Sequence, residues 1–365
     1  MSPYKNCMLC PRHCGVDREA GQVGYCKESS DLRIAFAGIH RGEEPPVTGA
    51  GGSGTIFISG CNLGCAFCQN YQISQKGMGR IVSTKEFAEI CLALDEKGAE
   101  NINIVTGSHT APAIALGIRA ARKQGLKIPV LWNSSGYDGK ETLEILKDVV
   151  DVYLPDLKTL DPAVAARFFN APDYPERATA AILKMMEYRE LNFGSGRKSA
   201  ASVSTFTPAY LVELPTMGAI VHETLVSGVM IRHLVLPGYL ESTYQVLRWF
   251  SENCMGETRG ETQGKTRGKA RGNGSGNSRG NGKALLSLMT QYTPVQTGSQ
   301  GTEREIPGSY ISEKEYEAVL SMLEEFGIDD GYCQELVTGS DWLPDFRRHN
   351  PFSSELSVPV WHCSQ

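Results

Sequence analysis

The sequence predicts an α/β fold in which successive strand–helix units form a parallel sheet, either open or curled into an incomplete barrel. Short apolar runs typical of buried strands alternate six times with amphipathic helical segments between residues 54 and 327. The 365 residues are 41% hydrophobic, which provides a sizeable core and argues against overall disorder. Ahead of this pattern, residues 1–50 are rich in cysteine, glycine and proline, which indicates a small lobe organised by metal.

The strands and helices follow one another along the chain. Strands are expected at 55–59, 101–105, 128–132, 150–154, 229–236 and 285–290. Helices are expected at 83–97, 111–123, 140–147, 242–252 and 312–326, with further helical segments between 162 and 190. The first and last of these helices begin with capping boxes, Ser83 with Glu86 and Ser312 with Glu315. Chemistry in such folds collects at the carboxyl ends of the strands, so functional residues are expected there.

We divide the chain into a cysteine-rich metal-binding lobe (1–50), a barrel domain (51–330) and a C-terminal extension (331–365). Two insertions interrupt the barrel domain. Residues 256–283 repeat glycine at every fourth position and carry seven Lys and Arg against two Glu. Such a segment buries too little apolar surface to offset its chain entropy, so we expect a disordered loop, with a nucleic-acid tether as the functional alternative. Residues 193–219, rich in Ser, Thr and Gly, are the second insertion.

Composition narrows the function classes. The formal net charge of −5 gives no nucleic-acid footprint over the whole chain, and we expect no nucleic-acid partner. Apolar runs fall short of the roughly 20 residues that a membrane helix needs. The first residues lack the apolar core of a signal peptide. We therefore expect a soluble, cytoplasmic protein without a membrane partner.

The sharpest motif is a set of three cysteines directly after the first predicted strand. Cys61, Cys65 and Cys68 have the spacing C-x3-C-x2-C and supply three local thiolate ligands. Thiolates favour zinc or iron–sulfur centres. A 4Fe–4S cluster held by three cysteines leaves one iron open for a ligand, whereas an electron-transfer ferredoxin closes all four positions. The alternative is a zinc site that is completed by a distant fourth ligand.

A second set of cysteines lies in the amino-terminal lobe. Its four members, with the spacing C-x2-C-x3-C-x11-C, are Cys7, Cys10, Cys14 and Cys26. Four ligands make a closed site, which is typical of structural or electron-transferring metals. An auxiliary 4Fe–4S cluster, a zinc ion and unligated thiols are the three alternatives. The remaining four cysteines are scattered, and no chemistry is assigned to them.

The three-cysteine motif, with Phe67 before its last cysteine and a strand before its first, resembles that of the radical S-adenosylmethionine superfamily. Gln69 and Asn70 resemble the segment that follows the cluster loop in pyruvate formate-lyase activating enzymes. The resemblance covers about residues 54–294 without the two insertions. The opening of the chain, with Pro11 after Cys10 and Tyr25 before Cys26, is similar to that of a branch of activating-enzyme-like proteins.

This resemblance implies a fold, cofactors and a reaction. The fold is an incomplete (βα)6 radical-SAM barrel. The open iron of a 4Fe–4S cluster binds S-adenosylmethionine, and reductive cleavage yields methionine and a 5′-deoxyadenosyl radical that removes hydrogen from a substrate. A reductant such as flavodoxin or ferredoxin is implied, and the substrate is a protein, a peptide or a small molecule. The alternative from another class is a non-catalytic iron–sulfur electron-transfer or carrier protein.

The resemblance also implies contacts to S-adenosylmethionine at the ends of successive strands. His109 is the polar residue in the segment where the family has a Gly-Gly-Glu-like contact to the methionine amino group, with a helix-entry residue of no chemical role as the alternative. Asn133 and Ser134 match a segment that reaches the ribose. Asp156 and Lys158 match the Asp-Leu-Lys of activating enzymes, and strand alternation places them on one face, with a surface ion pair as the alternative. Arg232 precedes a turn in the same way as a family arginine, and its guanidinium suits a carboxylate.

Overall fold

A computed structural model describes residues 2–196, 211–213, 223–256, 282–295 and 305–364. Six neighbouring parallel strands form the centre of its sheet, in the order β2 (Ser53–Ile58), β4 (Ile102–Val105), β5 (Val130–Ser134), β6 (Val152–Pro155), β9 (Glu223–Leu234) and β10 (Leu285–Met289). These are the six strands expected from the sequence. The predicted α/β fold with a parallel-strand sheet is therefore confirmed.

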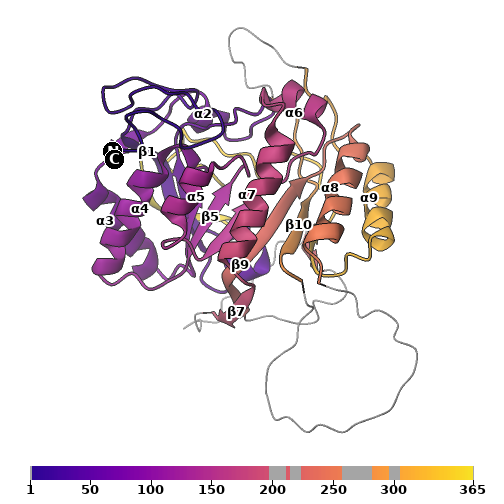
Figure 1. Cartoon of the computed structure of the whole chain (residues 1–365). Helices are drawn as coiled ribbons and strands as arrows, with labels where there is room; N and C mark the ends of the chain where they lie inside the picture. Colours follow the sequence, from indigo (N-terminus) through magenta and orange to yellow (C-terminus); the bar gives the residue numbers. More distant parts are fainter. Residues whose placement is uncertain (1, 197–210, 214–222, 257–281, 296–304, 365) are drawn as a thin grey trace, which may run out of the picture.

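Helices cover one face of this sheet, as Figure 1 shows. They are α3 (Thr84–Glu96), α4 (Ala111–Lys123), α5 (Lys140–Leu146), α6 (Pro162–Phe169), α7 (Tyr174–Tyr188), α8 (Leu240–Asn253) and α9 (Glu313–Glu325). The side chain of Ser312 accepts a hydrogen bond from the Glu315 amide, and the Glu315 carboxylate accepts one from the Ser312 amide. These two bonds confirm the predicted capping box. At α3, the Ser83 side chain accepts from the Glu86 amide as expected, but the Glu86 carboxylate bonds Arg80, so half of the predicted capping box is present. The helical region predicted between 162 and 190 is two helices, because Asn170 adopts a left-handed conformation that ends α6.

The sheet extends beyond the six predicted strands on both sides. On one side, β1 (Leu32–His40) runs antiparallel to β2, and β12 (Ser357–His362) runs antiparallel to β1. On the other side, β11 (Gly331–Gln334) runs parallel to β10 and pairs with β8 (Leu211–Glu213). Two short strands, β3 (Arg80–Val82) and β7 (Asn192–Ser195), pair with β1 and β9. None of these was expected from the sequence, and β1 lies within the stretch that we interpreted as a metal-binding lobe.

Residues 2–31 contain no helix or strand. This segment, drawn indigo in Figure 1, packs against α4 and α5 through a few specific contacts. The Tyr4 hydroxyl lies 3.4 Å from the Thr110 hydroxyl, and Thr142 donates a hydrogen bond to the carbonyl of Leu9 at 2.7 Å. The only apolar cluster centred in this segment is small, made of Tyr4, Cys7 and Leu9 with Val16 and Ile145 against it. Because this segment contains all four cysteines of the amino-terminal set, we call residues 2–31 the cysteine lobe.

Some of the predictions lie outside the described residues. They are the disordered loop at 256–283, apart from its two ends, and most of the insertion at 193–219. The division of the chain at residues 50 and 330 stays a prediction. No helix in the described ranges combines the length and the apolar character that a bilayer span requires.

Candidate functional site

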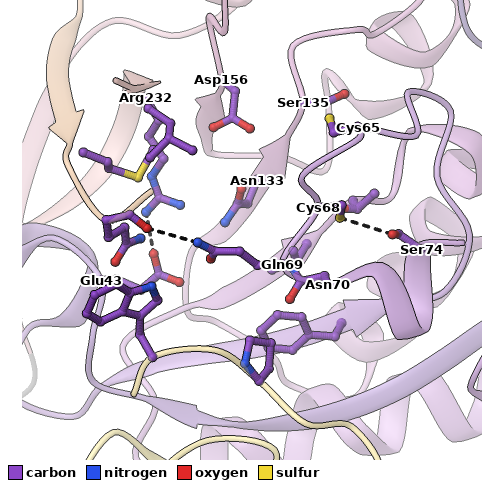
Figure 2. A pocket seen from close by; sticks show the side chains of 18 of the residues that line it. Glu43, Cys65, Cys68, Gln69, Asn70, Ser74, Asn133, Ser135, Asp156 and Arg232 are labelled. Atoms are coloured by element: carbon purple, nitrogen blue, oxygen red, sulfur yellow. Dashed lines mark hydrogen bonds and ion pairs between the residues drawn. The ribbon is translucent and has the colours of Figure 1, made fainter. Parts of the chain in front are cut away.

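A cavity of about 310 Å³ lies at the carboxyl ends of the parallel strands. Figure 2 shows Cys65 and Cys68 on one side of it, Glu43 and Arg232 on the other, and Asn133 between them. Its lining includes all three cysteines of the C-x3-C-x2-C motif and five of the strand-end residues predicted from the sequence: Cys61, Cys65, Cys68, Asn133, Ser134, Asp156, Lys158 and Arg232. The expected clustering of these residues at one end of the sheet is thus present in the structure.

The cysteine loop owes its shape to a turn at the end of β2. Gly60 has φ of 80°, and a Cβ there would lie 2.6 Å from the Glu28 side chain and 2.9 Å from the His109 ring, so only glycine fits. The amide of Gly60 donates to the carbonyl of Ile73, which brings the two ends of the loop together. Within the loop, the amide of Leu63 donates to the Cys61 sulfur at 3.4 Å.

The three cysteines of the motif are half-buried. Burial raises the pKa of Cys68 to about 11, and burial also raises the pKa of Cys65, while the ammonium group of Lys158 opposes the rise at Cys65. Thiols of this kind become good ligands when a metal displaces their protons. Among the described residues, no group of three or more His, Cys, Asp or Glu converges on a single ion. A 4Fe–4S cluster binds each thiolate through a different iron, so three thiols at the C-x3-C-x2-C spacing suit such a cluster.

Asp156 and Lys158 form an ion pair in the cavity wall. The Lys158 ammonium lies 2.5 Å from the Asp156 carboxylate, and the two side chains are 17% and 22% exposed. Burial opposes the charge on Lys158, but Asp156 outweighs it and raises the pKa of Lys158. The hydroxyl of Tyr174, buried below the pair, accepts a hydrogen bond from the Lys158 amide and bonds the carbonyls of Ser135 and Asp156. Both residues therefore occupy one face, as alternation predicted, and line the cavity instead of the outer surface.

The end of β5 contributes the last two residues of the strand and the residue that follows it to the cavity. The Ser134 hydroxyl donates to the buried carboxylate of Asp138, whose pKa is raised by burial. Ser134 is therefore committed to a protein partner. Asn133 turns its side chain into the cavity, as Figure 2 shows. The buried hydroxyl of Ser135 has no hydrogen-bond partner among the described residues, and the sequence analysis missed it.

Thr106, the first residue after β4, also lines the cavity. Its φ is 64°, a left-handed conformation that is costly for a β-branched residue, and its amide donates to the carbonyl of Asn133 at 2.9 Å. Backbone strain of this kind costs about 1–3 kcal/mol and occurs where function requires a particular backbone direction. This segment is the one that the resemblance assigns to the methionine amino group.

Arg232 binds carboxylates, but those carboxylates belong to the protein. Its guanidinium donates to Glu44 through Nε at 2.9 Å and through Nη2, and Nη2 also donates to Glu43 at 2.5 Å. Burial opposes the charge on Arg232, but Glu44 and Glu43 outweigh it and raise the pKa of the guanidinium. The role predicted for Arg232 in holding a ligand carboxylate remains a prediction.

Glu43 and Glu44 were missed by the sequence analysis. They lie just before α1 (Pro45–Thr48), between β1 and β2, and reach the cavity from the opposite side to the cysteines. The only sequence signal is the pair of acids before Pro45. Acids are common at the start of a helix because they interact favourably with the helix dipole, so this pair does not by itself indicate a site. Counting Glu43, Glu44 and Asp156 against Lys158 and Arg232, the cavity lining carries three acids and two bases, a net charge of −1.

His109 lies behind the cysteine loop and is not among the residues that line the cavity. It is 2% exposed, its Nε2 bonds the carbonyl of Ser59 at 2.8 Å, and its own carbonyl accepts from Arg18 at 2.5 Å. Burial, assisted by the charge of Arg18, lowers the pKa of His109 to about 4, so the ring is neutral at pH 7. The geometry is that of a residue that positions the end of β2, in place of the cofactor contact that we expected.

The cysteine lobe packs against the cysteine loop. Arg12 donates hydrogen bonds to four backbone carbonyls, those of Asn62, Leu63, Phe169 and Asn170, and its guanidinium lies 3.8 Å from the ring centre of Tyr25. Cys7, Cys10 and Cys26 are buried, and Cys14 is half-buried and accepts from the Tyr25 amide at 3.3 Å. Burial raises the pKa of Cys10 to about 12, and the neighbouring Cys26, Cys14 and Cys7 add to the rise. The four thiols therefore lie within electrostatic reach of one another.

Comparison with known proteins gives one family match. Residues 55–192 match the model of the Radical SAM superfamily. A relative from Methanocaldococcus jannaschii, described as uncharacterized protein MJ0674, is 36% identical over 179 residues, which cover 47% of this chain and 51% of that protein. The chain thus spans about half the length of the curated relative it matches.

Solved structures with a similar arrangement were also found. Streptococcus suis SuiB bound to S-adenosylmethionine is 14% identical, with a TM-score of 0.42 over 73% of this chain and 45% of SuiB. Methylornithine synthase (PylB) is 13% identical, with a TM-score of 0.41 over 72% of this chain and 59% of that chain.

Proposed function

Since residues 55–192 match the model of the Radical SAM superfamily, we propose that the protein is a radical S-adenosylmethionine enzyme. Cys61, Cys65 and Cys68 hold a 4Fe–4S cluster, and S-adenosylmethionine binds beside it in the cavity. When bound, the reduced cluster supplies one electron to S-adenosylmethionine, which splits into methionine and a 5′-deoxyadenosyl radical that takes a hydrogen atom from the substrate.

One observation carries the proposal. The three thiols of the motif open into the same cavity as polar side chains from the ends of successive parallel strands. An electron-transfer protein has no use for such a cavity, because its cluster is closed by four protein ligands. A cofactor that must be oriented against an open iron requires both features.

The chain's own residues bind and orient the cofactor. The cavity's net charge of −1 favours a cation, and S-adenosylmethionine carries a sulfonium. Lys158, held by Asp156, can donate to a carboxylate, and the side chain of Asn133 can bond ribose hydroxyls. Phe57 and Phe67 contribute apolar walls that limit access of water to a reactive intermediate.

We further propose an oxidoreductase subtype similar to pyruvate formate-lyase activating enzymes, with flavodoxin or ferredoxin as reductant in the cytoplasm. The strand-end pair Asp156 and Lys158 and the position of Arg232 support this subtype. Cys7, Cys10, Cys14 and Cys26 bind a second 4Fe–4S cluster or a zinc ion. Glycyl-radical partner proteins, peptides and small molecules are the substrate classes that this chemistry serves.

The test is a spectroscopic one on reconstituted protein. Iron and sulfide are added under anaerobic conditions to wild type, Cys65→Ala and the control Cys91→Ala, whose thiol is buried on α3 away from the cavity. We expect wild type and the control to give a reduced-cluster electron paramagnetic resonance signal that shifts when S-adenosylmethionine is added. In Cys65→Ala the shifting signal should be absent. A reducible wild-type cluster whose signal does not shift when S-adenosylmethionine is added would favour the electron-carrier alternative.

A further inference from the structure

The open side of the parallel sheet is crossed by a single long connection. β11 lies beside β10 at one side of the parallel strands, and β12 lies beside β1 at the other. Residues 335–356 join them, so this segment, here named the strap, must pass from one side of the sheet to the other. In Figure 1 the chain runs from α9 on one side of the molecule to the C-terminus beside β1 on the other.

The strap contains no helix or strand. Its 22 residues from 335 to 356 exceed the usual length of a connection without secondary structure, and connections of this length commonly serve as active-site lids or binding loops. Four strap residues line the same cavity as the cysteine motif: Trp342, Pro344, Phe352 and Leu356. The strap therefore forms a wall of the candidate active site.

The strap is fastened close to the cysteine loop. Gln72, in α2 (Tyr71–Ser74) just after Cys68, donates to the Asp345 carboxylate at 3.0 Å and accepts from the Phe346 amide at 2.8 Å. Phe346 is 1% exposed and packs against Phe57 of β2, with ring centres 5.4 Å apart. These contacts place the strap over the reacting centre and tie it to the segment that supplies the cluster ligands.

The strap also presents an unused hydrogen-bond donor. The indole Nε1 of Trp342 is buried and has no partner among the described residues, although the side chain lines the cavity. A buried donor without a partner costs about 1–3 kcal/mol, so it is expected where a ligand supplies the acceptor. Phe352 and Leu356 also line the cavity and add apolar surface that excludes water.

We propose that residues 335–356 close the barrel over its contents and restrict the substrate to a small molecule with a hydrogen-bond acceptor for Trp342. This inference rests on the proposed function and names its substrate class. A glycine loop of a folded partner protein would have to displace the strap, which means breaking both Gln72 hydrogen bonds and exposing Phe346. The cavity of about 310 Å³ must also hold the cluster and S-adenosylmethionine, so the space left beside them suits a small molecule better than a peptide loop.

The first test measures amide hydrogen exchange of the strap in cluster-loaded, unreduced protein. With S-adenosylmethionine added, peptides that cover 340–356 should exchange at least about fivefold more slowly, because their apolar residues close on an occupied cavity. Peptides from α8 serve as the internal control and should not change. Protection at residues 61–70 without protection of the strap would overturn the inference and leave the proposed function standing. No protection at either place would overturn both.

A pair of variants separates a fastened strap from an incidental loop. Gln72→Ala removes both hydrogen bonds to the strap, and Gln245→Ala removes an exposed glutamine contact on α8. We expect Gln72→Ala to raise the exchange rate of 340–356 by about tenfold, with Gln245→Ala at the wild-type rate. Equal rates in the two variants would contradict the fastening.

The second test addresses the substrate class directly. Reduced enzyme is given either the low-molecular-mass filtrate or the protein fraction of a host extract, and formation of 5′-deoxyadenosine is followed. The filtrate should accelerate the reaction. Trp342→Phe, which keeps an aromatic ring but lacks the donor, should weaken that acceleration, whereas the control Gln245→Ala on α8 should keep it in full. Acceleration by the protein fraction alone would overturn the proposal.

Discussion

The cavity at the strand ends and the cysteine lobe both carry sets of cysteines, but they are built differently. Cys61, Cys65 and Cys68 follow a strand whose six residues are all buried, so the sheet itself positions them. The cysteine lobe has no helix or strand among residues 2–31 and only a small apolar cluster. A segment of this kind needs another source of stability, which in small proteins is often a metal. The comparison indicates that the sheet preforms one site, whereas the other depends on its ligand.

Removing the lobe's ligands should produce the largest effect. In a variant with Cys7, Cys10, Cys14 and Cys26 all replaced by Ala, we expect the lobe to lose its metal and to become sensitive to proteolysis. The motif cluster should remain, because β2 and the loop are still present. Elemental analysis checks both statements and distinguishes zinc from iron.

The matched control is the triple variant Cys61→Ala, Cys65→Ala and Cys68→Ala, which should keep the lobe metal. If either variant lost all its metal while staying folded, the two sites would not be independent.

The second-largest effect tests the cavity at the strand ends, which is the site that the sheet preforms. Arg232→Met removes the cation that faces the half-buried Glu43 and the buried Glu44, and leaves both carboxylates without an opposite charge. Loss of one partner from a buried ion pair costs about 3–5 kcal/mol, so the free energy of unfolding in urea should fall by this amount. Arg347→Met, on an exposed side chain, is the control and should change it little. A small loss in Arg232→Met would show that the cavity is hydrated enough to solvate both acids.

Arg12 joins the two regions, and its loss should have an intermediate effect. Arg12→Ala removes a donor from four backbone carbonyls of the cysteine loop and of the end of α6, of which, among the described residues, only that of Leu63 keeps another donor, the Tyr25 hydroxyl. We expect about 2–3 kcal/mol of destabilisation and faster loss of the motif cluster to a chelator, because unsatisfied carbonyls cost about 1 kcal/mol or more each when buried. Arg177→Ala, on the surface of α7, is the control. Unchanged cluster retention would mean that the sheet alone shapes the loop.

The smallest effect is a pH dependence of the sheet region. His233, on β9, bonds the carbonyl of Leu157 and the hydroxyl of Thr243, and burial lowers its pKa to about 4. An ordinary histidine in the unfolded chain titrates near 6.5, so the stabilisation is complete above that pH and is lost as the pH falls towards 4. Between about pH 7 and pH 5 the protein should lose about 2 kcal/mol of stability through this residue.

His233→Gln should remove that part of the pH dependence, whereas His13→Gln, on an exposed side chain in the lobe, should leave it in place. Urea unfolding at the two pH values checks this. Identical pH slopes for wild type and His233→Gln would contradict the assignment.

How much could be predicted from sequence differs between the regions. Periodicity predicted all six parallel strands, and alternation placed Asp156 and Lys158 on one face, because both features depend on short stretches of chain. Glu43 and Trp342 could not be predicted, because they reach the cavity only through connections that cross the sheet. The structure places His109 behind the cysteine loop, which accords with the alternative of a helix-entry residue, since a strand-end position does not decide whether a side chain faces the cavity or the core.

For the cysteine lobe, the sequence predicted the candidate ligands but not where the segment lies in the fold. Its ligand spacing was evident from the sequence, but no periodic pattern could place residues 2–31 in space. Their position depends on individual contacts such as those of Arg12 and Arg18 with carbonyls far along the chain. Such contacts leave no signature that distinguishes them from surface arginines.

The most direct test of the account is the formation of 5′-deoxyadenosine by anaerobically reconstituted protein that receives dithionite and S-adenosylmethionine. The account predicts slow formation of 5′-deoxyadenosine and methionine in equal amounts without any substrate, detected by mass spectrometry, and none from Cys65→Ala. Wild-type protein with a verified, reducible cluster that yields no 5′-deoxyadenosine would contradict the claim that the cavity is a radical S-adenosylmethionine active site.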